Sequence, residues 1–255
     1  MLSRREERLL RSLRQRKHRE AEGLFVAEGV RAVEDLLLHS PLAVRFAAAS
    51  SSLGDTPRGQ SLAEAIHKRG IDLREVGDAA LRELAGTETP QGILAVAEIP
   101  RGGLGRIRVS GRTVVLVLDA VQDPGNFGTL ARTAEALGAA GVVALTGTVD
   151  PWNPKCVRAA MGSTFRLPVA EAGWEEAGTW LAEHGFQTLA SAAGGAPVPQ
   201  PPPTRAALVV GNEGAGISPE TRARADLVVG IPLRGRAESL NVAATGAILL
   251  YELLR

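Results

Sequence analysis

The second half of the chain alternates short apolar runs with segments of helical spacing, and this alternation limits the fold more than any other feature. The runs at 114–121 and 141–145 lack the regular polar residues of a strand with one wet face. Strands buried on both faces read in this way, and the helices between them form the crossovers of a parallel sheet. We therefore predict a parallel-sheet α/β domain over residues 113–255.

A smaller α/β domain is expected over residues 1–100, where helical and strand-like spacings also alternate. The glycine- and arginine-rich stretch at 101–112 then reads as a linker between the two domains. The expected helices are 4–17, 25–40, 62–70 and 79–86 in the first domain, and 129–137, 155–161, 174–184, 219–225 and 240–254 in the second. The other expected strands are 44–50, 72–77, 92–99, 186–192, 206–211 and 225–233.

The composition of the 255 residues excludes several classes of protein. A single cysteine, Cys156, rules out a disulfide framework and a cysteine-rich zinc site, and it suits a reducing compartment. No apolar run reaches the length of a membrane span, and the arginine-rich start lacks the apolar stretch of a signal peptide. The four histidines are scattered, and no metalloprotease or serine-hydrolase motif occurs. We expect a cytoplasmic protein with no metal and no membrane partner.

Polar residues and glycines gather after three of the expected strands, at 119–128, 211–216 and 231–241. The carboxyl ends of parallel strands meet at one edge of a sheet, and ligands bind there. The first of these segments places Asn126 where its side chain can cap a helix, and Arg132 follows one to two turns later. We therefore expect the functional site at this edge.

The second and third segments narrow the choice of ligand. The glycines of the second follow a G-x-x-G-x-G pattern, which differs from both common phosphate-binding loops, and Glu213 would repel a phosphate there. In the third segment Glu238, Ser239 and Asn241 form a polar cluster, and Ser239 is placed to cap the final helix. Capping explains these residues one by one, but it does not explain why all three polar sites fall at one edge.

The three segments together resemble the motifs of the SpoU, or TrmH-like, branch of the SPOUT methyltransferases. The family's N-x-G-x-x-x-R motif matches 126–132, its second motif matches VVGNEGAGIS at 209–218, and its third matches IPLRGRAESLNVAATGAILLYE at 231–252. No motif residue is missing. The segments GLFVAEGVRAVEDLL and TPQGILAV in the first half are similar to the family's RNA-substrate domain. The resemblance implies transfer of a methyl group from S-adenosyl-L-methionine to a ribose 2′-hydroxyl of RNA.

The resemblance also implies features that the sequence pattern alone does not. The C-terminal chain of the family forms a deep trefoil knot, which general rules of chain topology would exclude. Loops of the knot hold the cofactor, and the family is typically dimeric through its last helix. The cofactor contacts implied by motif position are Gly211, Ile231 and Leu240, with Asn212 and Leu233 adjacent.

Methyl transfer from a sulfonium requires the ribose oxygen to be aligned with the methyl group. Alignment of two bound reactants supplies about 7–11 kcal/mol, so we expect positioning to dominate. We expect Asn126, Ser239 and Asn241 to position the reactants. Glu213 is expected either to position its loop or to orient Arg132. A neutral Arg132 would cost roughly 8 kcal/mol at pH 7. We therefore expect Arg132 to bind the adjacent RNA phosphate as a bidentate fork, rather than to act as the base.

Residues outside the three motifs are candidates for RNA binding. The basic N-terminal helix is either a solvated face or a phosphate-contact surface formed by Arg14, Arg16 and Arg19, with Phe25 beside it. Arg158 is either a second phosphate clamp or a surface salt bridge. An additional N-terminal domain favours ribosomal RNA as the substrate.

Three alternatives stay open at this point. The chain could methylate tRNA ribose, it could be a knotted RNA-binding protein without catalysis, or it could be a nucleotide-binding α/β enzyme of another class. The intact motif residues argue against the second alternative, and the glycine pattern argues against the third.

Overall fold

The computed structural model describes residues 1–255, which divide into two compact units. The N-terminal unit comprises Met1–Arg101 and Trp152–Arg166, and the C-terminal unit comprises Gly102–Pro151 and Leu167–Arg255. The second unit thus differs from the continuous domain expected over 113–255, because residues 152–166 pack in the N-terminal unit. The reason is aromatic packing: the Phe25 ring centroid lies 4.7 Å from that of Trp152 and 5.6 Å from that of Phe165.

The N-terminal unit is built on a four-stranded mixed sheet with the order β1-β4-β2-β3. Its strands are β1 (Leu24–Glu28), β2 (Val44–Ala49), β3 (Leu73–Glu75) and β4 (Ile93–Glu98). β1, β4 and most of β2 are buried on both faces, so their alternate residues pack in two cores, whereas the edge strand β3 is not buried. One core includes side chains of α3 (Val30–His39), α4 (Pro57–Lys68), α7 (Pro154–Ala160) and α8 (Ser163–Arg166), and the other those of α1 (Arg4–Ser12) and α5 (Asp78–Leu84). The remaining helices are α2 (Arg16–Glu22) and the 3₁₀ turn η1 (Ser51–Asp55).

Two helices predicted in this unit were wrong in extent. The helix expected over 4–17 breaks into α1 and α2, and the buried guanidinium of Arg19 donates to the carbonyl of Leu13 at the break. The first residues of the helix expected over 25–40 form β1 instead, because they pair with β4 and are buried on both faces. The helix begins only after Gly29, whose φ of 94° suits glycine.

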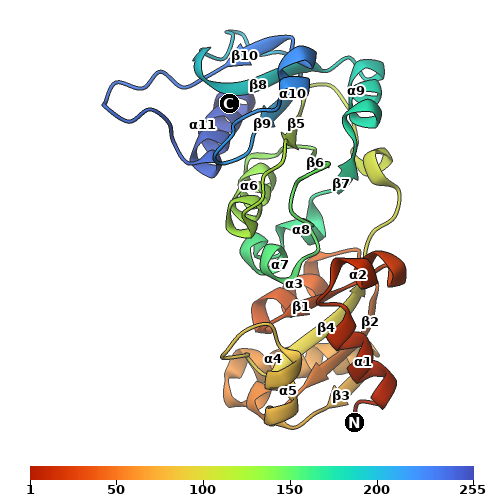
Figure 1. The fold of residues 1–255 in the computed structure, drawn as a ribbon. Coiled ribbons are helices and arrows are strands. Elements are labelled where there is room, and N and C mark those ends of the chain that lie inside the picture. The colour runs from red at the N-terminus through yellow and green to blue at the C-terminus, as the bar shows by residue number, and fades with distance from the viewer. The chain divides into compact units, whose positions relative to one another are not determined.

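The C-terminal unit contains a six-stranded sheet in which every pairing is parallel, with the order β10-β8-β9-β5-β6-β7. The predicted parallel-sheet α/β fold is therefore confirmed, although β7 was not predicted. The strands are β5 (Thr113–Leu118), β6 (Gly141–Leu145), β7 (Val169–Ala172), β8 (Gln187–Ala196), β9 (Arg205–Val210) and β10 (Leu227–Val229). The edge strand β10 lies beyond β8 (Figure 1).

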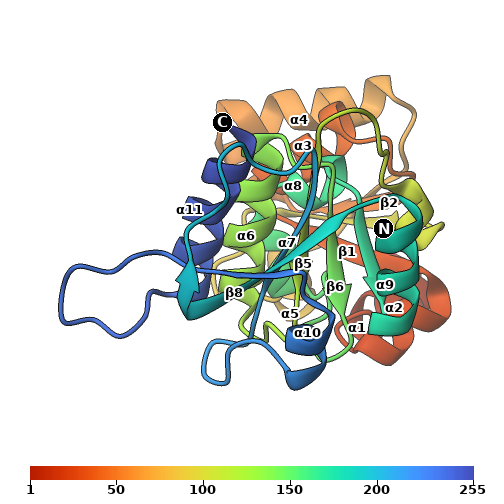
Figure 2. The ribbon, with the colours of Figure 1, turned by 90° about the horizontal axis from the view of Figure 1, so that it is seen from above.

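Helices cover both faces of this sheet. On one face α6 (Pro124–Leu137) and α11 (Val242–Leu254) lie side by side over β5, β6 and β9 (Figure 2). On the other, α9 (Trp174–Glu183) and the 3₁₀ turn η2 (Gly103–Arg106) contribute to the core, and α10 (Pro219–Arg224) contacts α9. None of the helices combines the length and the apolar character that crossing a bilayer requires.

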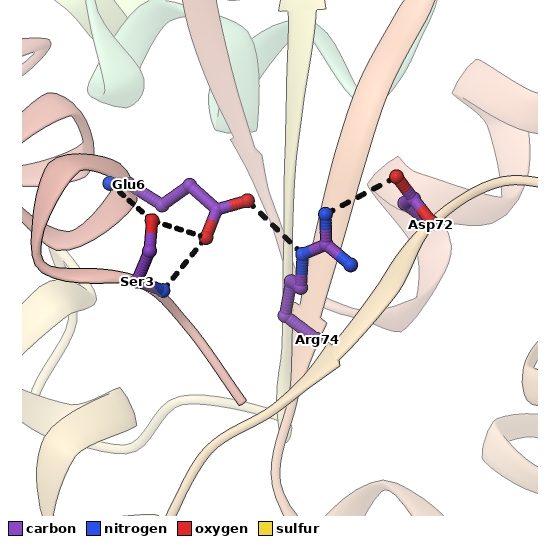
Figure 3. Close-up of polar contacts among 4 residues, drawn as sticks. All are labelled: Ser3, Glu6, Asp72 and Arg74. Carbon is purple, nitrogen blue, oxygen red and sulfur yellow. Dashed lines mark hydrogen bonds and ion pairs between the residues drawn. The ribbon is translucent and has the colours of Figure 1, made fainter.

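A capping box at the start of α1 ties this helix to the strand β3 (Figure 3). The backbone N–H and the hydroxyl of Ser3 both donate to Glu6 Oε2 at 2.7 Å, and Arg74 Nε donates to Glu6 Oε1 at 3.0 Å. Arg74 also pairs with Asp72 at 3.2 Å. The hydrogen bonds from Ser3, followed by those from Arg74, lower the pKa of Glu6 to about 2, although burial opposes the shift.

This lowered pKa predicts how stability depends on pH. A carboxyl with a folded-state pKa below its unfolded value stabilises the fold above the unfolded pKa, and the contribution is lost as the pH falls through the folded pKa. Glu6→Gln should therefore lower the free energy of unfolding near pH 7, and the difference from the wild type should narrow as the pH falls from about 4.3 toward about 2. Urea denaturation across this range measures the difference. If the difference in the free energy of unfolding between the wild type and Glu6→Gln does not depend on pH, the ionised carboxylate is not its cause.

Candidate active site

The loop after β9 and the turn after β5 are joined by the carboxylate of Glu213. It accepts hydrogen bonds from the backbone N–H of Gln122 at 3.3 Å and of Asp123 at 3.1 Å, and from Asn126 Nδ2 at 3.0 Å. The carboxylate therefore lies at the N-terminus of α6, where the helix dipole favours a negative charge. These contacts are those that the first of the two roles expected for Glu213, the positioning of its loop, requires; the role itself stays a prediction.

The third expected strand end joins the same group. Asn241 Nδ2 donates to Asn126 Oδ1 at 3.1 Å, so Asn126 accepts from Asn241 and donates to Glu213. One continuous line of hydrogen bonds therefore connects the three sequence motifs. Capping did not explain why polar residues gather at one sheet edge. This hydrogen-bond network explains it.

The helix caps differ from the prediction. α6 is capped by Asp123, whose Oδ1 accepts from the backbone N–H of Asn126 at 2.8 Å, and not by the Asn126 side chain. α11 is capped by Asn241, whose Oδ1 accepts from the N–H groups of Ala243 and Ala244, and not by Ser239. The side chain of Asn126 is thereby available to bridge the other two motifs.

Hydrogen bonds lower the pKa of Glu213 in spite of its surroundings. Burial is the largest single influence and would raise this pKa, but the hydrogen bonds from Asn126 and from the backbone N–H groups of Glu213, Asp123 and Gln122 together outweigh it. The carboxylate is thus held in its charged form, in which it can accept from all of these donors. A protonated Glu213 would lose part of that capacity.

Asn212 and Asp119 hold the rest of the loop. Asn212 Nδ2 donates to the carbonyl of Ala120 at 2.9 Å, and its Oδ1 accepts from two N–H groups within the loop. The buried Asp119 accepts at 2.6 Å both from the backbone N–H of Ser218 and from the Thr221 hydroxyl. Asp119 was not predicted as a site residue, although it is the first residue of the segment 119–128. Its signal was a lone carboxylate directly after an apolar strand.

A cavity of about 680 Å³ lies beside this network, within the usual range of about 300–1,000 Å³ for small-molecule pockets. Its walls come from the segments 191–195, 210–217, 230–233 and 237–240, with Arg222, Val242 and Thr245. All five expected cofactor contacts line it: Gly211, Asn212, Ile231, Leu233 and Leu240. Glu213 and Ser239 line it too, whereas Asn126, Arg132 and Asn241 do not.

The lining fits S-adenosylmethionine chemically. Ile231, Leu233 and Leu240 offer apolar contacts for an adenine ring, and the loop backbone, Glu213 and Ser239 offer polar groups for the ribose and the amino-acid part. Such a mixture is typical of pockets that bind small molecules through few, fixed polar groups.

Gly211 is required for a different reason from the one its motif position suggests. A Cβ at this position would overlap the backbone of Gly216 and Ile217, in the same loop. A larger residue at 211 would therefore displace the loop itself, rather than only intrude on a bound cofactor.

Arg132 is exposed on α6, and Ser239 is exposed at the cavity.

Two of the RNA-binding residues expected in the N-terminal unit were wrong. Phe25 is 0 % exposed and lies in the core, and Arg19 is 2 % exposed with its head group on a backbone carbonyl, so neither can reach RNA in this fold. Arg14 and Arg16 are exposed, but Arg14 donates to the carbonyls of residues 83 and 85, and Arg16 pairs with Glu20.

Arg158 is held by an ion pair. Its Nη1 lies 3.2 Å from Oε2 of Glu28, whose side chain is only 5 % exposed. The same oxygen accepts from the backbone N–H of Gly86 at 2.9 Å. Of the two expectations the structure therefore shows the salt bridge, although its carboxylate is buried and not on the surface.

Asp119→Ala tests the support of the loop. The Ser218 N–H and the Thr221 hydroxyl both donate to Asp119 Oδ2, and the variant removes this acceptor from both. We expect the free energy of unfolding to fall by at least about 1–3 kcal/mol, the cost of one unsatisfied buried group, and the affinity for S-adenosylmethionine to fall as the loop shifts. Urea denaturation and calorimetric titration measure the two effects. Glu176→Ala, at an exposed carboxyl on α9, is the control. Unchanged cofactor affinity in Asp119→Ala would show that Asp119 does not support the cavity.

Comparison with known proteins places these features in a family. Residues 113–251 match the model of the SpoU rRNA Methylase family, and residues 8–95 match that of the MRM3-like substrate binding domain. The chain is 38 % identical over 245 residues, 95 % of its length, to the Bacillus subtilis 23S rRNA (guanosine(2553)-2′-O)-methyltransferase RlmP, of which it covers 93 %.

Solved structures agree with this match. The SpoU methyltransferase AviRb from Streptomyces viridochromogenes in complex with AdoMet has a TM-score of 0.87 at 28 % identity, over 99 % of this chain and 97 % of that one. An AdoMet-bound rRNA methyltransferase from Sinorhizobium meliloti has a TM-score of 0.85 at 31 % identity, over 99 % and 95 %. The chain belongs to the SpoU rRNA methylase family.

Proposed function

We propose that this protein transfers the methyl group of S-adenosylmethionine to a ribose 2′-hydroxyl of ribosomal RNA. The observation that carries the proposal is the Glu213–Asn126–Asn241 line, which joins all three family motifs beside a cavity that fits the cofactor. The names of the relatives support the substrate class: RlmP acts on guanosine 2553 of 23S rRNA, and a Streptomyces viridochromogenes relative, 34 % identical over 184 residues, acts on uridine 2479.

The reaction requires mainly that the protein holds the ribose oxygen in line with the methyl group. S-adenosylmethionine supplies an electrophilic methyl group, and the loops at 211–217 and 230–240 are the part of the chain that would hold it. Ser239 lines the same cavity, and we propose that its hydroxyl forms a hydrogen bond with a ribose hydroxyl. The network fixes the turn before α6, and so fixes the helix that carries Arg132.

Arg132 is proposed to bind the phosphate next to the target ribose. It is exposed six residues after Asn126, on the helix whose start the network holds. Arginine stays charged at neutral pH and forms bidentate contacts with phosphate. The proton of the ribose hydroxyl then passes to the phosphate or to water, rather than to the guanidinium.

The proposal includes a trefoil knot in the C-terminal unit. The knot is supported by the path of the chain: β10 is an edge strand, yet α11, which follows it through a long loop, packs on β9 and β5 inside the sheet (Figure 1). The paired strands β8 and β10 approach closely at their ends: a Cβ on Gly195 would overlap the carbonyl of Val229, and one on Gly230 would lie 2.7 Å from the carbonyl oxygen of Ala192.

A homodimer in the cytoplasm completes the proposal. α11 exposes two large apolar side chains, Ile248 (41 %) and Tyr251 (55 %), which a second copy of the chain could bury. We propose the C-terminal unit as the dimer interface on this ground, and ribosomal RNA as the substrate places the protein in the cytoplasm.

Methyl incorporation tests the function directly. Purified protein with labelled S-adenosylmethionine should methylate unmodified 23S rRNA transcripts at one ribose, and should leave tRNA unlabelled. Labelled tRNA would favour the tRNA alternative, and no incorporation into either RNA would favour an RNA-binding protein without catalysis.

Arg132 variants test its role. Arg132→Lys keeps the charge but loses the fork, so the single-turnover rate should fall at least about 10²-fold. Arg132→Ala should be slower still, and both should bind S-adenosylmethionine like the wild type. Arg108→Lys, an exposed arginine before β5, is the control. A rate in Arg132→Lys equal to that of the control would remove the phosphate fork from the mechanism.

A further inference from the structure

We infer that a second cavity, within the N-terminal unit, binds an unpaired nucleotide of the RNA substrate; this inference rests on the proposed function. The cavity has a volume of about 280 Å³. Its walls are the end of β1 with the start of α3, the loop at 87–91, Arg58, and two residues of the 152–166 segment, Arg158 and Met161. We call it the α3 cavity.

The charged groups of the α3 cavity are paired, with one exception. Glu28 pairs with Arg158 at 3.2 Å, Asp35 pairs with Arg166 at 3.5 Å, and Arg58 pairs with Glu34. Arg31 is exposed at the cavity, and its side chain makes no hydrogen bond or ion pair within the protein. The uncompensated charge among the lining residues is therefore a single arginine, which suits a single phosphate.

The cavity also contains hydrogen-bond donors that have no partner within the protein. Gln91 Oε1 accepts from the backbone N–H of Val30 at 3.0 Å, which fixes the orientation of the amide and leaves its NH₂ group without a protein partner. The Thr89 hydroxyl also has no protein partner, whereas that of Thr87 is taken by Glu28. A ligand for this cavity must bring acceptors, and phosphate oxygens and the carbonyl and ring-nitrogen atoms of a base are such acceptors.

Apolar surface completes the cavity. Ala32 and the exposed Met161 line it, and they offer contacts for the flat face of a base. Proteins recognise RNA sequence mainly through unstacked bases, whose faces and edges are both accessible. A pocket with one free arginine, uncommitted donors and an apolar wall therefore fits a nucleotide that is turned out of its helix.

The 152–166 segment forms one wall of this site. Arg158 and Met161 lie outside the region that matches the substrate binding domain, 8–95, and inside the region that matches the methylase, 113–251. Gly162 packs so closely on α3 that a Cβ would lie 2.5 Å from Asp35 Oδ2. The nucleotide site is thus assembled from both family regions, and residues 8–95 alone lack a wall of it.

Steady-state kinetics of the full-length protein on unmodified 23S rRNA transcripts test the inference. Arg31→Gln should raise the KM for RNA about 10-fold, leave kcat and the affinity for S-adenosylmethionine unchanged, and reduce the salt slope of RNA binding by about 1. Gln91→Glu keeps the acceptor for Val30 N–H but removes the free donor, and it should raise KM in the same direction. Arg69→Gln is the matched control, since Arg69 is exposed at the end of α4 and lacks an internal partner.

The outcomes separate the two proposals. If Arg31→Gln and Gln91→Glu have the same KM and RNA affinity as Arg69→Gln, the nucleotide site is wrong even though the wild type methylates RNA. If the wild type transfers no methyl group, the proposed function fails, and filter binding of the same transcripts then tests the site. Loss of RNA affinity in Arg31→Gln but not in Arg69→Gln would support it, and a wild type that does not bind RNA would overturn it.

Discussion

The carboxylate of Glu213 is the contact on which the arrangement of the active-site edge depends. It accepts from two backbone N–H groups of the turn before α6 and from the side chain of Asn126, which in turn accepts from Asn241. Three segments that are distant in the sequence are therefore oriented by one group. Without this acceptor, the turn would lose partners for N–H groups that no helical hydrogen bond satisfies. The low pKa of Glu213 keeps the acceptor charged.

Close backbone approach is the second constraint on this edge. A Cβ on Gly195 or Gly230 would meet the backbone of a neighbouring segment, and a Cβ on Gly211 would meet the backbone of its own loop. The cavity segments at 191–195, 211–217 and 230 are thus packed backbone against backbone, which restricts their shape. Such pre-organisation suits a reaction in which alignment supplies most of the acceleration.

Much of the fold could be predicted because the C-terminal strands are uninterrupted apolar runs, which only a sheet covered on both faces can bury. The failures involve tertiary contacts. The break between α1 and α2 is stabilised by the buried guanidinium of Arg19, whose position no local spacing reveals. Residues 152–166 alternate like the rest of the second half, and tertiary contacts assign them to the other core: the rings of Trp152 and Phe165 against Phe25, and the ion pair of Arg158 with Glu28.

The residues of the candidate site that belong to a motif could be predicted from the sequence. The residues that take part only through their position in the fold could not. Glu213, Asn126 and Asn241 were identified by residue type and spacing, and the structure joins them. Asp119 was missed because a lone carboxylate carries no motif. Arg19 was wrongly predicted to bind RNA because the density of charge does not show which arginines already form hydrogen bonds within the protein.

Native-state hydrogen exchange in Glu213→Ala tests the central role of this carboxylate most directly. The variant removes the acceptor without adding a group, and Glu213 is exposed, so the core is untouched. We predict that the amides of Gln122 and Asp123 exchange at least about 10-fold faster than in the wild type, the effect of losing a contact of about 1.4 kcal/mol. The amide of Leu116 inside β5 should keep its wild-type rate. Equal exchange of Gln122 and Asp123 in the two proteins would contradict the claim that Glu213 holds the three motifs together.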